Sequence, residues 1–444
     1  MRKRITTLAI AVPLLCLVMA FAYQLPPIHS RLSWRLDELR TRIKYAIDPP
    51  DEAVFVPGGG TPPGVRTITQ TPVPSPTSTL PSNLANAKLD RGPTETPLPS
   101  PTPTIPPTPL PEQVRLDGVK YEDQHGRWNY CGPANLSMAL TFWGWDGNRD
   151  VVGKAIKRND DDKNIMPYEM QDFVRANAPG LDALVRFGGD IDLLKRMVAG
   201  GFPVVAEKGY YEYDYTGKLG WLGHYQFVTG YDDAKRVLIV QDTYVKDGKN
   251  HEFSYDDFIE GWRSFDYTFL VVFPQERADE VYTLLGPYAD TDWATRHALE
   301  VAQSEAQTLA GIDQFFAWFN VGTSHVNLQE YGDATYAFDY AFSTLYPNLP
   351  EDKMRPYRMM WYQTWPYWAY YYTGRYQDVI NLANTTLNDT ISEPVLEESF
   401  YWRGLAKEAL GDSQGAIDDY RQSVRLNPNF GSGWEQLNRL GVGP

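Results

Sequence analysis

The chain has 444 residues, a formal net charge of −15 and a pI near 4.9. This acidity argues against a nucleic-acid-binding surface, because neutralising phosphates requires clustered lysine and arginine. Two cysteines and six histidines exclude a disulfide framework and a cysteine-rich zinc site, and 43% hydrophobic residues exclude a chain that is disordered throughout. The length predicts two or three domains.

Residues 1–23 are predicted to be a transmembrane anchor or a signal peptide. Arg2, Lys3 and Arg4 precede an apolar run from residue 5 to residue 23, close to the roughly 20 residues that span a bilayer. The small residues Ala20 and Ala22 also fit a signal-peptide cleavage site. Both interpretations place the rest of the chain on the extracytoplasmic side of the cell membrane, and the anchor is favoured.

Residues 24–56 are predicted to contain a juxtamembrane amphipathic helix. Leu32, Leu36, Leu39 and Ile43 recur at helical spacing, with arginines between them. Such a helix either rests on the membrane surface or forms a short solvated stalk. A membrane is therefore the first predicted partner of the chain.

Residues 57–112 are predicted to be a disordered tether rich in proline and threonine. Sixteen of the 55 residues from 57 to 111 are proline. A segment of this composition cannot bury enough apolar surface to fold, and as extended polyproline II it would reach on the order of 170 Å. We interpret it as a spacer.

A candidate nucleophile opens the folded part, which is predicted to begin at residue 113. Pro133 suits the first turn of a helix, and Leu136 and Leu140 continue one helical face. Cys131 would therefore lie at a helix N-terminus, where the macrodipole favours the thiolate.

A candidate base and its carboxylate follow on a predicted antiparallel hairpin. Residues 223–231 and 236–242 are predicted to be strands on either side of a polar turn near Asp233. In each pair of residues that face each other across the hairpin, the two residue numbers then add up to about 466. His224 is therefore expected opposite Asp242, on the same face of the sheet. A shift of one residue would move Asp242 to the other face. His125 is the alternative base.

Cys131, His224 and Asp242 supply the residue types of a thiol hydrolase: a nucleophile, a base and a carboxylate that orients the base. Gln124 lies seven residues before Cys131. Its side-chain NH₂, together with the Cys131 backbone N–H, could stabilise an oxyanion.

These residues, with the Cys131–Gly132–Pro133–Ala134 helix start and the Val240-x-Asp242 strand, resemble the family-39 cysteine peptidases, which are papain-like. The match covers about 114–274 and implies an α+β papain-like peptidase domain at 113–275. It also implies Cys131 as nucleophile, His224 as base, Asp242 as orienting residue and Gln124 in the oxyanion hole. A peptide or protein would be the substrate.

The remaining elements of this domain are a helix at 192–199 and strands at 202–206 and 267–273. The aromatic segment 208–220 is predicted to be a loop that either lines a substrate cleft or covers the surface. No phosphate-binding loop, paired metal-binding histidines or cysteine pair is present, so no cofactor or metal is predicted. The acidic run 160–162 is interpreted as hydrated.

Residues 276–444 are predicted to form an all-α solenoid. Three units resemble tetratricopeptide repeats, and the third, which runs from Gly404 to Pro428, is the clearest. A helical lead-in covers 278–307. The aromatic stretch around Trp361–Tyr372 either packs the repeats or lines a groove that binds a peptide.

Two hypotheses for the function follow. The first is a membrane-tethered, extracytoplasmic cysteine peptidase, or a related amide hydrolase, whose repeats bind a protein partner. The alternative is a non-catalytic cell-surface adaptor. The presence of every residue type that the chemistry requires favours the first.

Overall fold

The computed structural model describes residues 55–58, 109–127, 129–157, 159, 162–213, 219–349, 355–389 and 395–444, with eight positions between 35 and 47. Those eight positions are helical and exposed. Within the described residues, no helix combines the length and the apolar character needed to cross a bilayer. The predicted anchor at 1–23 and most of the predicted tether lie outside them, so both stay predictions.

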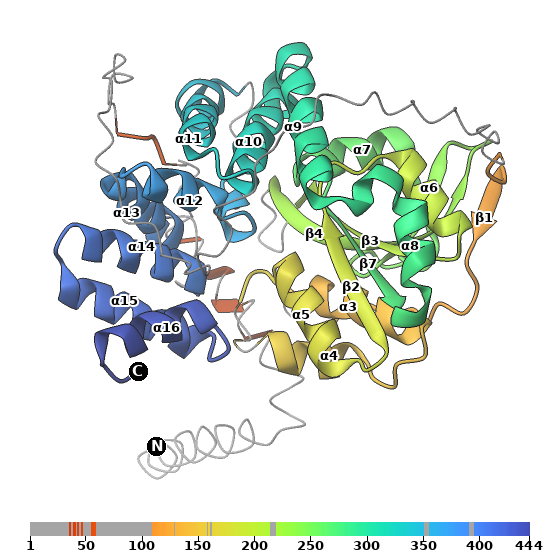
Figure 1. The fold of residues 1–444 in the computed structure, drawn as a ribbon, viewed down its shortest axis with the longest axis horizontal. Coiled ribbons are helices and arrows are strands. Elements are labelled where there is room, and N and C mark those ends of the chain that lie inside the picture. Colours follow the sequence, from red (N-terminus) through yellow and green to blue (C-terminus); the bar gives the residue numbers. More distant parts are fainter. Residues whose placement is uncertain are drawn as a thin grey trace, which may run out of the picture. The chain divides into compact units, whose positions relative to one another are not determined.

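The domain that contains the candidate residues is built on one antiparallel sheet (Figure 1). Its strands run in the order β2-β7-β3-β4-β5-β6, and β1 pairs with β4. They are β1 (Gln113–Arg115), β2 (Leu181–Arg186), β3 (Val204–Tyr213), β4 (Leu219–Asp232), β5 (Val237–Asp242), β6 (His251–Ser254) and β7 (Phe269–Pro274). The domain is therefore α+β, with a helical region after it.

Helices cover both faces of this sheet. The helices α3 (Cys131–Phe142), α4 (Arg149–Ile156) and α5 (Pro167–Asn177) enclose one core with Val205, Phe227 and Leu270. The helices α6 (Ile191–Ala199), α7 (Tyr255–Arg263) and α8 (Ala278–Leu285) enclose the other core with Val204 and Val271. Adjacent residues of one strand thus enter opposite cores, as the two-residue period of a strand requires.

Two segments differ from their predicted structure. The aromatic segment at 208–220 belongs largely to the long β3–β4 hairpin, because β3 continues to Tyr213 and β4 begins at Leu219. The aromatic helix expected from Trp361 begins later: a 3-10 turn covers Met359–Trp361, and α12 (Trp365–Tyr372) follows with a proline near its start. Proline suits a first helical turn, so Pro366 accounts for the later beginning.

The C-terminal region consists of helices joined by turns and loops, with no strand among its described residues (Figure 1). After α9 (Thr291–Thr308) come three helical hairpins and a final helix. They are α10 (Gly311–Asn327) with α11 (Tyr331–Tyr340), α12 with α13 (Tyr376–Asn384), α14 (Glu397–Ala409) with α15 (Ser413–Leu426), and α16 (Gly431–Leu440). This arrangement is consistent with the predicted tetratricopeptide-like region.

Small residues let the paired helices approach closely, as the repeat pattern predicts. A Cβ atom added at Gly322 would lie 2.6 Å from the Phe338 ring, and one at Gly404 would lie 2.7 Å from the Tyr420 ring. Both rings are fully buried. The glycines are therefore required by packing and not by backbone conformation.

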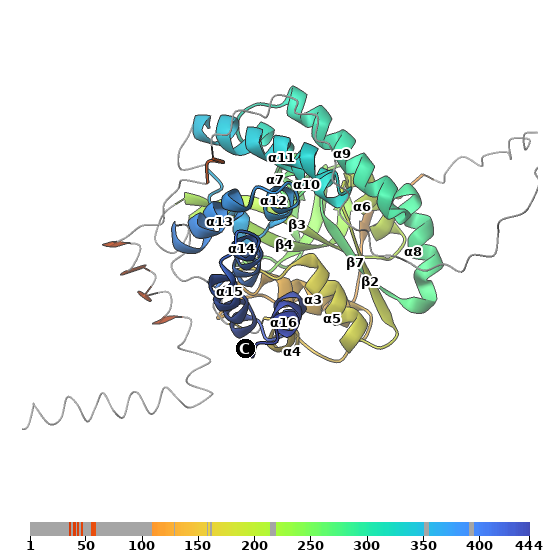
Figure 2. The ribbon, with the colours of Figure 1, turned by 60° about the vertical axis from the view of Figure 1, so that its left-hand side comes forward.

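The helical region and the sheet domain share one buried aromatic junction. Trp221 of β4 stacks on Phe265, with ring centroids 5.4 Å apart, and contacts Phe316 of α10 at 5.8 Å and Tyr362 at 5.6 Å. The side chain of Gln363 also donates a hydrogen bond to the Ser264 carbonyl at 2.7 Å. Because residues 111–444 belong to one compact unit, the helices form part of the surroundings of the sheet. Figure 2 shows the last helices close to α3–α5.

A short segment before the proline-rich stretch is bound to the helical region. Phe55 is only 4% exposed and contacts the rings of Phe342 and Tyr370, at centroid distances of 6.3 and 5.8 Å. The Gly58 N–H donates to Asp378 at 2.9 Å. At the other end of the stretch, the Tyr231 hydroxyl donates to the Pro111 carbonyl at 2.7 Å.

Replacing Gly404 by alanine should destabilise the helical region by about 1–3 kcal/mol, because the added methyl group meets the Tyr420 ring. Gly332→Ala is the matched control, since a Cβ there has no neighbour within 4 Å. The midpoint of urea unfolding of the full-length chain should fall for Gly404→Ala and stay unchanged or rise for Gly332→Ala. Equal midpoints for the two variants would contradict this account of the packing.

Candidate active site

Cys131 is the first residue of α3 and lies beside β4, beyond the point where β5 ends. The Tyr225 carbonyl accepts a hydrogen bond from the Asn135 side chain at 2.8 Å, and the Tyr225 backbone also hydrogen-bonds to Cys131. β5 ends at Asp242, opposite Gln226, the residue that follows Tyr225 on β4. The half-buried thiol is thereby held at the edge of the strand that carries His224.

His224 and Asp242 form a buried pair. The His224 Nε2 lies 3.1 Å from Asp242 Oδ1, and the two residues are 3% and 4% exposed. The backbone N–H groups of Tyr244 and Val245 donate to the same carboxylate at 2.8 and 3.2 Å. Because Nε2 faces Asp242, Nδ1 is the nitrogen left for the side-chain hydrogen bond with Cys131.

The register that joins these residues differs from the predicted one. The structure pairs Asp242 with Gln226, and His224 pairs with Lys208 on β3. The prediction that His224 lies opposite Asp242 is therefore wrong by two residues, a shift that preserves the face. The pairing passes through a β-bulge between Val228 and Gly230.

The bulge is what places Asp242 on the correct face. Near the turn, facing residues are Asp232 with Val237 and Gly230 with Ile239. That register alone would put Asp242 opposite Phe227, on the other face from His224. One extra residue on β4, Thr229, shifts the pairing by one position and returns Asp242 to the face of the sheet that carries His224. The Gln241 side chain donates to the Thr229 hydroxyl at 2.9 Å and so holds the bulge.

The electrostatics favour a thiolate–imidazolium pair. Burial alone would raise the pKa of the Cys131 thiol, but the hydrogen bond and the charge of His224 lower it overall. Burial would lower the pKa of His224, yet the Asp242 carboxylate and Cys131 raise it to about 10. Burial would likewise raise the pKa of Asp242, but the His224 charge and the hydrogen bonds hold it well below its usual range. The arrangement therefore supplies a nucleophilic sulfur and an adjacent proton donor.

Gln124 is fixed beside the carboxylate. Its backbone N–H donates to the Thr243 carbonyl at 2.8 Å, and its side-chain oxygen accepts from the Thr243 hydroxyl at 2.8 Å. Thr243 directly follows Asp242. Because the oxygen is engaged, the NH₂ group is the end of the side chain that is oriented away from Thr243. The structure thus brings all four predicted residues into one region.

The alternative base, His125, occupies a different position. Its Nε2 lies 2.8 Å from the Tyr244 carbonyl, and its Nδ1 lies 3.5 Å from Asp123. The imidazole that interacts with Cys131 is that of His224. Tyr210, from the segment expected to be a loop, lies against His224 with ring centroids 5.5 Å apart.

Sequence reasoning missed two supporting residues. The Gln226 side chain donates to the second oxygen of Asp242 at 2.5 Å, and the Asn135 side chain joins α3 to β4. Gln226 could have been found from its two-residue spacing from His224, which places both on one face of the strand. Asn135 carried a weaker signal: it is a polar residue on the apolar face of a helix.

One group in the described residues has the composition of a metal site. His325, Glu330 and Asp333 offer ligand atoms that lie within 4.8 Å of one another. His325 Nδ1 is already 2.7 Å from Glu330, and Asp333 is exposed. The group is distant in sequence from the candidate catalytic residues, and the hydrogen bond between His325 and Glu330 accounts for their proximity.

Residues 116–269 match the model of the Peptidase_C39 like family. This match confirms the resemblance to family-39 peptidases inferred from the sequence. Over 154 residues the chain is 27% identical to the RNA polymerase-associated protein CTR9 of Saccharomyces cerevisiae (strain ATCC 204508 / S288c). The alignment covers 34% of this chain and 13% of that protein, so the chain spans a small part of this relative.

Two solved structures are also similar. A C39-like peptidase from Bacillus anthracis is 16% identical, with a TM-score of 0.30, and the match covers 37% of this chain and 98% of that one. Xylellain, a cysteine protease from Xylella fastidiosa, is 17% identical, with a TM-score of 0.29. The match covers 37% of this chain and 87% of xylellain. Scores this low do not establish a common fold.

Alkylation of Cys131 by iodoacetamide should begin well below the free-cysteine pKa of about 8.5. In His224→Ala, the onset should move to higher pH, because the hydrogen bond and the charge of His224 are lost while burial still raises the pKa of the thiol. The measurement follows the modified Cys131 peptide by mass spectrometry in the full-length chain. His125→Ala is the matched control and should behave as the unmodified chain does. An onset near pH 8.5 in all three proteins would rule out the pair.

Asp242→Asn should lower the pKa of His224, because burial would remain while the carboxylate charge is lost. The imidazolium then deprotonates at lower pH, and the onset of Cys131 alkylation should rise to a value between those of the unmodified chain and His224→Ala. Asp247→Asn, an exposed position in the following loop, serves as the control. No difference between these two variants would contradict the role of Asp242.

Proposed function

We propose that this chain is a cysteine peptidase that hydrolyses peptide or amide bonds through Cys131, His224 and Asp242. The observation that carries this proposal is the buried His224–Asp242 pair, which hydrogen-bonds to a thiol at a helix N-terminus. The family model matched by residues 116–269 supports the same chemistry. The fused helical region is proposed to bind protein, and residues 1–23 to hold the enzyme outside the cytoplasm.

The reaction begins with the thiolate–imidazolium pair. The Cys131 sulfur attacks the carbonyl carbon, and the His224 imidazolium donates its proton to the leaving amine as the C–N bond breaks. The acyl group is then held as a thioester. Neutral His224 takes a proton from water, the resulting hydroxide attacks the thioester carbon, and the C–S bond breaks. The acid product leaves, and the ion pair is restored.

Three groups stabilise charge along this path. Asp242 holds Nε2 of His224 and favours the imidazolium, so the proton is available at Nδ1. The Cys131 backbone N–H and the Gln124 NH₂ are assigned to the oxyanion that forms on the carbonyl oxygen.

The peptidase proposal is tested with the full-length chain and a proteome-derived peptide library, in which new N-termini are identified by mass spectrometry. New termini should be generated by the unmodified chain and should be absent with Cys131→Ala and His224→Ala. A Cys131-dependent release of amide-linked products without new N-termini would restrict the activity to non-peptide amides. The absence of both signals, with an unreactive Cys131, would overturn the proposal and leave the adaptor function.

The Gln124 assignment predicts a specific kinetic signature. Gln124→Ala and Gln124→Glu should each lower kcat by about 10²–10³-fold with little effect on KM, because neither side chain donates a hydrogen bond to the oxyanion. The pH onset of Cys131 alkylation should be retained in both variants, since alkylation forms no oxyanion. A loss confined to Gln124→Ala would instead indicate a purely structural role.

A further inference from the structure

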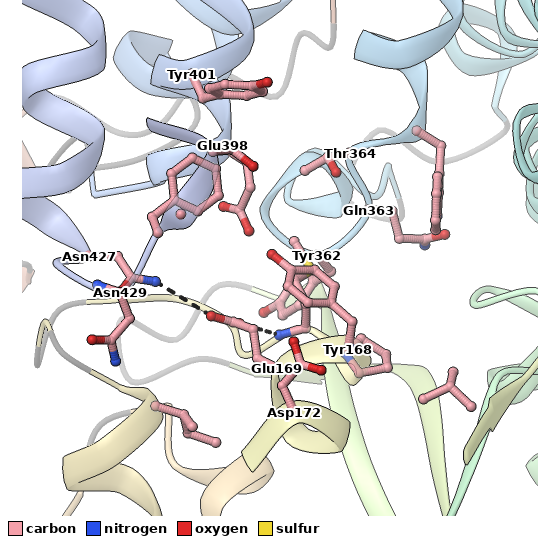
Figure 3. Close-up of a pocket in the computed structure, with 18 of the residues that line it drawn as sticks. Tyr168, Glu169, Asp172, Tyr362, Gln363, Thr364, Glu398, Tyr401, Asn427 and Asn429 are labelled. Carbon is pink, nitrogen blue, oxygen red and sulfur yellow. Dashed lines mark hydrogen bonds between the residues drawn. The ribbon is translucent and has the colours of Figure 1, made fainter. Parts of the chain in front are cut away.

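A cavity of about 1010 Å³ lies between the sheet domain and the helical region (Figure 3). Helices α4 and α5 and strands β2 and β3 contribute residues from one side, and α12, α14 and α16 contribute from the other. Figure 3 shows Glu169 and Asp172 from α5 across from Glu398 and Tyr401 of α14. The volume is at the upper end of the about 300–1,000 Å³ typical of ligand sites and holds more than one side chain.

The walls of this cavity are aromatic and acidic. Eleven aromatic side chains line it, among them Tyr168, Tyr362, Trp368 and Tyr372. The acidic ones are Glu169, Asp172, Glu207, Glu398 and Glu435. No lysine, arginine or histidine is among the described residues that line it. Aromatic faces combined with carboxylates form a favourable environment for an organic cation.

One of these carboxylates has a free oxygen. Glu207 is only 4% exposed, and its Oε1 has no hydrogen-bond partner in the described structure. The carboxyl interacts with Tyr225 through a side-chain hydrogen bond, and desolvation by burial raises its pKa well above the ordinary value. A buried carboxylate oxygen without a donor is unfavourable unless a ligand supplies one.

Two other acids of the cavity lie in a group of carboxyl groups that repel one another. Burial, with the charges of Glu169 and Asp162, raises the pKa of Glu398 to about 8. Burial and the charges of Glu397 and Asp162 also raise the pKa of Glu169 well above its ordinary value. A bound cation would relieve the repulsion among these carboxylates.

Two residues that line the cavity lie close to the neighbours of the candidate catalytic residues. Glu207 pairs across the β3–β4 ladder with Tyr225, whose ring approaches a Cβ added at Gly132 to 3.7 Å. On the helical side, a Cβ at Gly223, the residue before His224, would lie 2.7 Å from Tyr362. The Tyr225 side chain thus separates Glu207 from Gly132, the neighbour of Cys131, and Tyr362 directly contacts Gly223, the neighbour of His224.

We propose that this cavity is a substrate subsite that binds a lysine side chain of the peptide, with the helical region forming one of its walls. A lysine has a compact ammonium group with three donors and a long apolar stem, which match the carboxylate oxygens and the aromatic rings. The exposed lining residues Tyr168 and Tyr372 mark where the cavity opens to solvent. The inference rests on the proposed peptidase function, because it identifies the substrate side chain that the enzyme recognises beside the scissile bond.

The test measures binding and not hydrolysis, so the full-length chain carries Cys131→Ala. The probes are three acetylated and amidated hexapeptides that differ at one central residue: lysine, norleucine or glutamate. The lysine peptide should bind about tenfold or more tightly than the norleucine peptide, and the glutamate peptide should bind most weakly. Isothermal titration calorimetry gives the three Kd values.

Variants locate the binding to the cavity. Glu207→Gln and Glu398→Gln keep the side-chain shape and should each remove most of the lysine preference, and Trp368→Ala should weaken binding of the lysine peptide. The matched controls are Glu300→Gln and Trp293→Ala on α9, which do not line the cavity and should leave all three Kd values unchanged.

Equal Kd values for the lysine and norleucine peptides would overturn the inference, as would a lysine preference that the cavity variants leave intact. The two proposals fail separately. An unreactive Cys131 with a retained lysine preference refutes the peptidase, and a reactive Cys131 with equal Kd values refutes only the lysine subsite.

Discussion

The arrangement of the chain depends on the buried aromatic junction around Trp221. Its ring joins β4, the turn after α7 and the helical region in a single core. Three residues further along β4 lies His224, so the strand that carries the base also carries the attachment of the helices. The cavity exists because this junction fixes the helical wall opposite α4 and α5. Separation of the two parts would expose large aromatic side chains to water, which the hydrophobic effect opposes.

The features predicted correctly from the sequence are those that depend on residues close to one another in the chain. The helix start at Cys131 follows from Pro133 and the spacing of Leu136 and Leu140, and the hairpin follows from apolar runs around a polar turn. The register could not be obtained in this way, because it depends on the extra residue at Thr229. Gly230, an isolated glycine within a strand, was the available sign of a bulge. A Cβ there would lie 2.6 Å from the Val114 carbonyl.

The cavity was beyond prediction from the sequence for a different reason. Asn427 approaches Glu169 at 3.5 Å, and Asn429 donates to the Ala155 carbonyl at 3.1 Å, across more than 250 positions of the chain. No local pattern encodes such contacts. The aromatic stretch near Trp361 was predicted either to pack the repeats or to line a groove. Its residues divide between the two roles, because Tyr367 and Tyr370 are fully buried while Tyr362, Trp365 and Trp368 line the cavity.

The attachment of residues 55–58 changes what the proline-rich stretch can do mechanically. Phe55 is inserted between Phe342 and Tyr370, and Pro111 is held by Tyr231, so both ends of residues 59–110 are fixed to the same unit. The stretch therefore leaves the folded unit at Gly58 and rejoins it at Pro111. A proteolytic nick within it would divide the polypeptide into two fragments, but Phe55 and Gly58 would still hold them together as a non-covalent complex.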